Sequence, residues 1–269
     1  MSGSSDGEGD AYKSVYRRFN DPLSRKLREE AYGEDIGQHS WVTADELRAD
    51  ITRLCIRAEH RVLDLGCGPG GPLTFVVRAT GCSGVGLDVS DEAVEAARVR
   101  AFEAGVGSRI TFHQADLDKT IDAKGPFDAA FSLDVVLHLR NRLKCFRDVA
   151  RLLKPGGRFL FTDASVLTAP ISNAEFALRS GHGHTQIVPD GYNEEALAAA
   201  GLRVMEREDR TASALKNAEG RLRARLSHRA EIEALEGTAA FEQQQRYLEC
   251  VAALSARRAL SRIMYLTEV

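Results

Sequence analysis

Through the middle of the chain, short apolar segments alternate with segments in which apolar residues recur at helical spacing. The apolar segments predict β-strands at Arg61–Leu65, Gly84–Val89, Ile110–Ala115, Phe127–Leu133, Arg158–Asp163, Arg203–Asp209 and Arg262–Val269. The repeats between them predict helices, notably over Asp91–Ala104, Arg142–Leu153 and Glu194–Ala200. Near-continuous apolar strands joined by helical crossovers form a parallel sheet covered on both faces. The expected fold class is therefore α/β, as a doubly wound sandwich with its ligand crevice at the carboxyl ends of the strands.

Helical patterns precede this alternation. Residues 11–19 place apolar side chains at helical spacing. Asp21 and Pro22 are typical of a helix start, and the helix that they begin is expected to run to about Tyr32 and to end at Gly33.

Two more helical regions flank the core. Thr43 and Glu46 have the spacing of a capping box and predict another helix start. Ala212–Leu260 is rich in arginine and glutamate around apolar stripes, which predicts a pair of amphipathic helices inserted before the last strand. The insertion is expected to cover the site as a lid; core packing and a dimer contact are the alternatives.

These patterns divide the chain into five segments. They are a disordered tail (1–10), an N-terminal helical cap (11–58), an α/β core (59–211), a helical lid insertion (212–260) and the last core strand (261–269).

Composition bears on three kinds of partner: nucleic acids, membranes and metal ions. Across 269 residues the formal net charge is −3, which disfavours a nucleic-acid partner. No apolar run approaches the roughly 18 residues that a membrane span needs, and the Ser/Gly/acidic N-terminus is not a signal peptide. The five cysteines lack a C-x-x-C pair, which favours free thiols in the cytoplasm over a metal site. The composition is compatible with both a monomer and a homo-oligomer.

The stretch RVLDLGCGPGGPLTF contains the main chemical signal. Gly66, Gly68 and Gly71 spell the dinucleotide fingerprint G-x-G-x-x-G, in which backbone N–H groups approach a ligand at a strand-to-helix turn. Asp64 precedes the turn, and a carboxylate there would repel a pyrophosphate. A ligand with a cationic end is favoured instead.

The same loop, D-L-G-C-G-P-G, resembles the acid-x-G-x-G-x-G loop of class I S-adenosylmethionine-dependent methyltransferases, whose ligand carries an ammonium and a sulfonium. Lys154-Pro-Gly-Gly157 matches the family's K-P-G-G turn before the fifth strand. The resemblance implies a Rossmann-like seven-stranded methyltransferase sheet, mostly parallel, with an antiparallel last strand. It also implies that the cofactor S-adenosyl-L-methionine is bound by Asp64, Gly66, Gly68, Gly70, Asp88, Val89, Asp116, Leu117 and Leu133.

The segment Ala31–Trp41, AYGEDIGQHSW, is similar to a G-E-[DN] element of phosphoethanolamine and glycine/sarcosine methyltransferases. There the element closes the methionine end of the cofactor. The resemblance implies that Gln38 and Trp41, with Glu34 and Asp35, cap the site; an ordinary linker between two helices is the alternative.

The stretch SLDVVLHL resembles the S-x-D-x-x-L-H-L motif of the phosphoethanolamine enzymes. The resemblance implies that Asp134 binds or orients a cationic nucleophile and that His138 removes its proton, for which an imidazole is well suited. A structural role for His138 is the alternative.

The match to those enzymes then weakens. Their catalytic tyrosine aligns with Asn20, and the tyrosines of their phosphate site are not evident here. Tyr32 and Arg179 are the candidate substrate residues, the latter for an anionic group. His182 and His184 could chelate a metal, but without a third ligand a glycine-rich loop is the preferred interpretation, and no metal is expected.

The sequence therefore predicts a methyltransferase that acts on an amine or hydroxyl of a small metabolite or natural product. A methyltransferase for RNA or another macromolecule is the main alternative, although S-L-D-V stands where amino-directed nucleic-acid enzymes carry N-P-P-Y. A non-catalytic cofactor-binding or scaffold protein is the other alternative.

Overall fold

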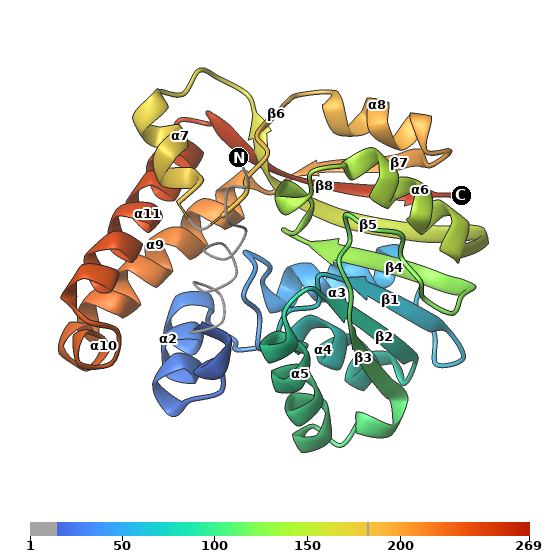
Figure 1. The fold of residues 1–269 in the computed structure, drawn as a ribbon, viewed down its shortest axis with the longest axis horizontal. Helices are drawn as coiled ribbons and strands as arrows, with labels where there is room; N and C mark the ends of the chain where they lie inside the picture. Colours follow the sequence, from blue (N-terminus) through green and yellow to red (C-terminus); the bar gives the residue numbers. More distant parts are fainter. Residues whose placement is uncertain (1–14, 182) are drawn as a thin grey trace, which may run out of the picture.

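A computed structural model describes residues 15–181 and 183–269. The tail at 1–10, and the first part of the helix expected at 11–19, lie outside the described residues. Figure 1 shows one twisted sheet flanked by helices, with a group of helices at one end of the strands.

The sheet has eight strands, seven of them in the order β3-β2-β1-β4-β5-β8-β7, with the short β6 beside β5. Their bounds are β1 Arg61–Leu65, β2 Ser83–Asp88, β3 Ile110–Gln114, β4 Phe127–Leu133, β5 Leu153–Leu167, β6 Val188–Pro189, β7 Arg203–Asp209 and β8 Leu260–Glu268. Strands β1 to β6 pair in parallel, whereas β8 is antiparallel to both of its neighbours. The predicted Rossmann-like methyltransferase sheet with a reversed last strand is confirmed.

Two strand predictions need correction. The fifth strand is much longer than Arg158–Asp163, because the K-P-G-G stretch lies inside β5, where the register against β4 shifts. Strand β6 was not predicted, since two residues are too short to give an alternating pattern.

The helices occupy the positions between the strands and both flanks of the core. They are α2 Pro22–Tyr32, α3 Ala44–Arg53, α4 Gly71–Thr80, α5 Asp91–Glu103, α6 Arg142–Leu152, α7 Asn173–Arg179, α8 Tyr192–Ala199, α9 Thr211–Ser227, α10 Arg229–Glu236 and α11 Thr238–Ala256, with 3-10 turns at Gly107–Arg109 (η1) and Val136–His138 (η2). The predicted end of α2 and the predicted start of α3 are confirmed: Gly33 ends α2 with φ 80°, and Thr43 forms a capping box with Glu46.

Alternation along each strand separates two apolar layers. Leu63 and Leu65 of β1 face a core that includes Phe146 of α6 and Leu197 of α8. Val62 faces the opposite core, which contains residues of α3, α4 and α5. Asp64 has the same parity as Val62, so a carboxyl group is placed within a buried strand, at the edge where the ligand crevice of such sheets lies.

The insertion contains three helices and not two, because Gly237 separates the short α10 from α11. Helices α9 and α11 pack on each other, and α9 also packs on α2 (Figure 1). The approach of α2 and α9 depends on Gly220: a Cβ built there would lie 2.4 Å from the carbonyl oxygen of Ala31. This contact joins the insertion to the N-terminal helices.

We expect Gly220→Ala to destabilise the protein by about 1–3 kcal/mol, because the added methyl group overpacks the α2–α9 crossing. In an unconstrained helix the same change would stabilise by up to about 1 kcal/mol, so the sign is diagnostic. Chemical unfolding would measure the difference, with Glu219→Ala on the exposed side of α9 as the control. A Gly220 variant as stable as the wild type would contradict the tight crossing.

Candidate functional site

The glycine turn begins where β1 ends. Gly66, Gly68 and Gly70 all have positive φ (74°, 51° and 74°), and Gly70 caps the start of α4. A Cβ at Gly66 would meet Val135 at 2.5 Å, whereas the nearest atom to a Cβ at Gly68 would be the Tyr16 hydroxyl at 3.9 Å. The turn is therefore packed tightly on its inner side and open at Gly68.

Asp64 lies beneath this turn with an incomplete set of hydrogen bonds. Its side chain is buried, and its Oδ2 has no partner among the described residues. Burial, together with the nearby Asp88 carboxylate, raises the pKa of Asp64 well above its ordinary value. A buried acceptor of this kind fits a ligand that brings a cation or N–H donors, and it does not fit a phosphate.

The other predicted cofactor residues lie along the carboxyl ends of the strands. Asp88 ends β2, and its carboxylate accepts hydrogen bonds from the backbone N–H groups of Gly68 (2.8 Å) and Ser90 (3.0 Å). Val89 is 64% exposed, and Asp116 is partly exposed on the loop after β3. The remaining two, Leu117 and Leu133, are buried in the two apolar cores. Asp88, the exposed side chain of Val89 and Asp116 thus follow one another along this edge of the sheet.

The N-terminal segment lies directly on the glycine turn. A Cβ at Gly71 would stand 2.1 Å from the carbonyl oxygen of Gly37, so the two backbones are in contact. Asp35 stabilises the segment by pairing with Arg28 (2.8 Å) and accepting the N–H of Gly37. Gln38 is buried, and its Oε1 accepts the N–H of Ile36.

The other candidate residues of the N-terminal segment make contacts within the protein. Glu34 forms a two-oxygen pair with Arg48, an exposed side chain of α3. Asn20, the position of the family's tyrosine, accepts a hydrogen bond from Arg100 at 2.6 Å. Tyr32 is half-buried and donates its hydroxyl to the Ser40 carbonyl, and desolvation raises its pKa.

Asp134 follows β4 with φ 59°, in the left-handed region that aspartate tolerates. Its carboxylate accepts hydrogen bonds from three groups: the Trp41 backbone N–H (2.8 Å), the Thr162 hydroxyl (2.8 Å) and the Arg262 guanidinium (2.9 Å). Arg262 in turn pairs with Glu46 at 2.9 Å. The side chains of Asp134 and Arg262 are only 4% and 1% exposed. Both carboxylate oxygens of Asp134 are therefore used by this chain.

His138 ends the 3-10 turn that follows Asp134. Its Nδ1 lies 2.9 Å from the carbonyl oxygen of His184, an acceptor only, so Nδ1 carries the proton and Nε2 carries the lone pair. Burial lowers the pKa of His138, the largest of several effects on that ring. A neutral imidazole with its basic nitrogen fixed is the arrangement that proton removal requires.

A buried ion pair supports the His184 segment. Arg142 and Asp163 pair at 2.6 Å with both side chains fully buried. Arg142 also donates to the Gln186 carbonyl (2.6 Å), while the Gln186 N–H donates to the carbonyl of Leu137. These contacts fix the carbonyl that sets the tautomer of His138.

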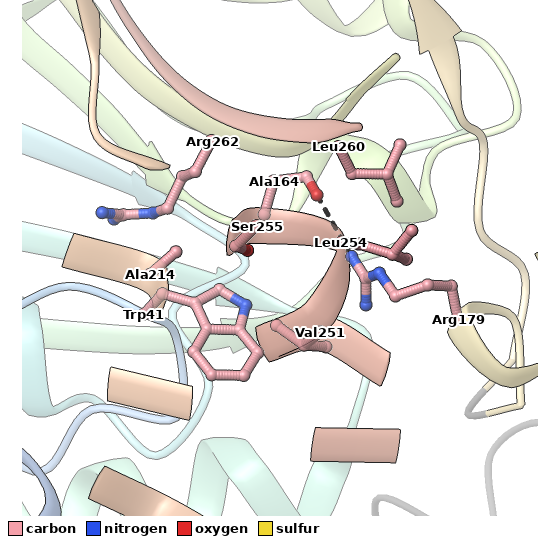
Figure 2. Close-up of a pocket in the computed structure, with 9 residues that line it drawn as sticks. All are labelled: Trp41, Ala164, Arg179, Ala214, Val251, Leu254, Ser255, Leu260 and Arg262. Carbon is pink, nitrogen blue, oxygen red and sulfur yellow. Dashed lines mark hydrogen bonds between the residues drawn. The ribbon is translucent and has the colours of Figure 1, made fainter. Parts of the chain in front are cut away.

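Figure 2 shows a small cavity lined in part by Trp41 and Arg262, which both contact Asp134. Its volume is about 10 Å³, enough for about one water molecule. It is lined by Trp41, Ala164, Arg179, Ala214, Val251, Leu254, Ser255, Leu260 and Arg262. In Figure 2 the Arg179 guanidinium lies beside Ala164, whereas that of Arg262 points away from the other labelled side chains. Arg179 donates to the Tyr247 hydroxyl and the Ala164 carbonyl. Most of the lining residues are apolar; Ser255, Arg179 and Arg262 are the polar ones, and Arg262 is paired with Asp134 and Glu46.

The residues that the sequence interpretation missed are Arg142, Asn217 and Arg262. An arginine inside the otherwise apolar RIMYLTEV run was a usable signal for Arg262, because a charge in a core strand needs a partner. Nothing local marked the other two. His182 of the H-G-H stretch lies outside the described residues, and no group of three or more potential metal ligands occurs within the described ranges.

The strand order, the glycine turn and the unpartnered Asp64 define a nucleotide-type fold whose ligand has a cationic end. Comparison with known proteins agrees: residues 62–157 match the family described as "Methyltransferase domain". The 27-O-demethylrifamycin SV methyltransferase of Amycolatopsis mediterranei is 30% identical over 195 residues, which cover 68% of this chain and 72% of that enzyme.

Solved structures show the same fold at lower identity. Phosphoethanolamine N-methyltransferase 2 of Haemonchus contortus has a TM-score of 0.78 at 19% identity and covers 96% of this chain, which spans 60% of that one. The [4+2]-cyclase SpnF has a TM-score of 0.75 at 22% identity, with 97% of this chain and 94% of that one covered. These two likenesses bear on the fold alone.

The chain belongs to the class I S-adenosylmethionine-dependent methyltransferases that act on small molecules. Its cofactor is S-adenosylmethionine, as the resemblance implied. The dinucleotide interpretation of the glycine loop is wrong, because the Asp64 carboxylate next to the turn would repel a pyrophosphate.

Proposed function

We propose that the enzyme methylates a hydroxyl group of a small, largely apolar metabolite or natural product. The observation that carries the proposal is the hydrogen bond from His138 Nδ1 to the His184 carbonyl, which gives Nε2 the form of a general base. A hydroxyl must lose its proton during methyl transfer, so a base of this kind has a task there.

S-adenosylmethionine supplies a methyl group on a sulfonium, which is already an activated leaving group. The Asp64 carboxylate is proposed to bind the ammonium end, and Asp88 the ribose hydroxyls. The residues proposed to line the rest of the donor site are Gly66, Gly68, Gly70, Val89, Asp116, Leu117, Leu133 and Gln38. The main task of this chain is then to align donor and acceptor, which can contribute roughly 7–11 kcal/mol.

The charges around the cavity favour a neutral or anionic acceptor over a cationic amine. Arg179 and Arg262 line the cavity, and the Asp134 carboxylate beside it is already paired. Arg262 is neutralised by Asp134 and Glu46, whereas Arg179 donates to a hydroxyl and a carbonyl. An ammonium group would therefore meet the charge of Arg179, at a cost that burial increases. We therefore prefer the hydroxyl to the amine, and assign Asp134 to holding Trp41.

The small cavity supports a lid role for the insertion. A volume of about 10 Å³ admits no organic acceptor, so α9, α11 and α7 must move to admit one. We propose that segments 11–58 and 212–260 form the cap and lid over the 59–211 core.

None of the described helices is long and apolar enough to cross a bilayer. A cytoplasmic location remains part of the proposal, and the mild negative charge argues against an RNA substrate.

Deuteriomethyl-labelled S-adenosylmethionine and a panel of paired acceptors would test the proposal. Each pair would share one apolar skeleton, once with a hydroxyl and once with a primary amine. Label in the hydroxyl member, located by mass spectrometry, is the expected result. Label only in the amines would overturn the acceptor assignment while leaving the methyltransferase class intact.

A further inference from the structure

The backbone of Trp41 joins the donor side of the site to the helical insertion. Its N–H donates to Asp134 Oδ2 at 2.8 Å, and its carbonyl accepts Nδ2 of Asn217 at 2.6 Å. Asn217 lies on α9 and is only 1% exposed. The backbone of one residue is thus hydrogen-bonded through its N–H to the end of β4 and through its C=O to the insertion.

The indole of Trp41 strengthens the same connection. It is 6% exposed and packs with Ala164 of β5, Ala214 of α9 and Val251 of α11. In Figure 2 the ring lies near Ala214 and Val251 of the insertion. Trp41 therefore belongs to the wall of the acceptor cavity at least as much as to the donor site.

The other end of the same segment contacts the glycine turn. Gly37 lies against the backbone of Gly71, only a few residues before Trp41. Asp134 is itself held in place by the buried Arg262, which also pairs with Glu46 of α3. The segment is thus held at the donor turn, at β4 and at α9.

We propose that Asp134 and Asn217 are positioning residues that use the Trp41 backbone as a latch, so that seating the N-terminal segment on bound donor closes the insertion over the acceptor cavity. The latch rests on the proposed function, since it couples the two ligands of that reaction. Ligand binding then shifts an equilibrium between open and closed insertion.

The single tryptophan of the chain makes the latch observable, because acrylamide quenching of its fluorescence reports access to Trp41. The test uses the full chain with saturating S-adenosylhomocysteine, and calorimetry to measure its affinity. In Asn217→Ala we expect affinity within about threefold of the wild type but at least about twofold more quenching, since the latch loses one of its two hydrogen bonds. Lys216→Ala, an exposed neighbour on α9, should match the wild type in both.

Hydrogen exchange supplies the second readout. S-adenosylhomocysteine should slow exchange in residues 36–42 of both proteins, but in α9 and α11 of the wild type only. Asn217→Ser, which keeps a shorter polar side chain, serves if the alanine variant does not fold, with the same outcome expected. Equal shielding of Trp41 in wild type and Asn217 variants would overturn the latch alone. A wild type that binds no S-adenosylhomocysteine would defeat the latch and the proposed function together.

Discussion

Replacing Asp64 with asparagine should weaken S-adenosylmethionine binding by about 100-fold, while the protein stays folded. The carboxylate Oδ2 is buried and has no partner among the described residues, so an incoming ammonium would form a charge-assisted bond in a low-dielectric site. Asparagine keeps the shape but removes the charge. Titration calorimetry with S-adenosylmethionine would measure the loss.

The same variant should be at least as stable as the wild type without ligand. Because burial raises the pKa of Asp64, the folded state holds its proton more tightly than the unfolded state. The wild type therefore loses stability as the pH rises from the unfolded pKa through the raised folded pKa, and the asparagine variant does not.

Ligand binding should show the opposite dependence. As the pH falls through the raised pKa of Asp64, the carboxylate is protonated and affinity for S-adenosylmethionine drops. The asparagine variant should lack this component. Asp122→Asn, which removes an equal charge from an exposed loop, is the control. Unchanged affinity in Asp64→Asn would reject the assignment of the donor site.

Replacing His138 with glutamine is expected to lower turnover of an identified hydroxyl acceptor by about 100- to 1,000-fold, the usual contribution of a general base. Affinity for S-adenosylmethionine should stay within about twofold, because the ring is assigned to the acceptor side of the site. Single-turnover kinetics would separate the two quantities.

The pH profile distinguishes a base from a structural histidine. Since burial lowers the pKa of His138, the neutral base persists below the ordinary imidazole range, and the wild-type rate should fall only at lower pH. The glutamine variant should lose that acidic limb. His113→Gln, on the exposed face of β3, is the matched control. A rate that is reduced in His138→Gln but keeps the acidic limb would mean that His138 is structural.

The elements with strong local signals were predicted well. β1, β4 and β7 have the predicted bounds, and the capping box at Thr43 forms as expected. The errors fall where tertiary pairing decides: β5 extends to Leu167 because β8 and β6 pair with its far end. The insertion divides at Gly237, which periodicity alone did not separate.

The candidate site divides in the same way. Asp64 and the glycines were identifiable from the sequence, because an acid directly before a glycine turn favours a ligand with a positive charge over a phosphate. The resemblance implied a cation-binding Asp134, but the structure gives its carboxylate Arg262 as a partner from 128 residues along the chain. No local pattern contains such a contact, because the pairing exists only when β8 returns antiparallel beside β5.

By itself, the sequence determined the order of strands and helices, the glycine turn and the sign of the ligand's charge, since each depends on neighbouring residues. Only the tertiary structure decided which groups meet above the sheet. The tautomer of His138, the neutralisation of Asp134 and the two hydrogen bonds of Trp41 all join distant segments, and their energies depend on burial that exists only in the folded chain.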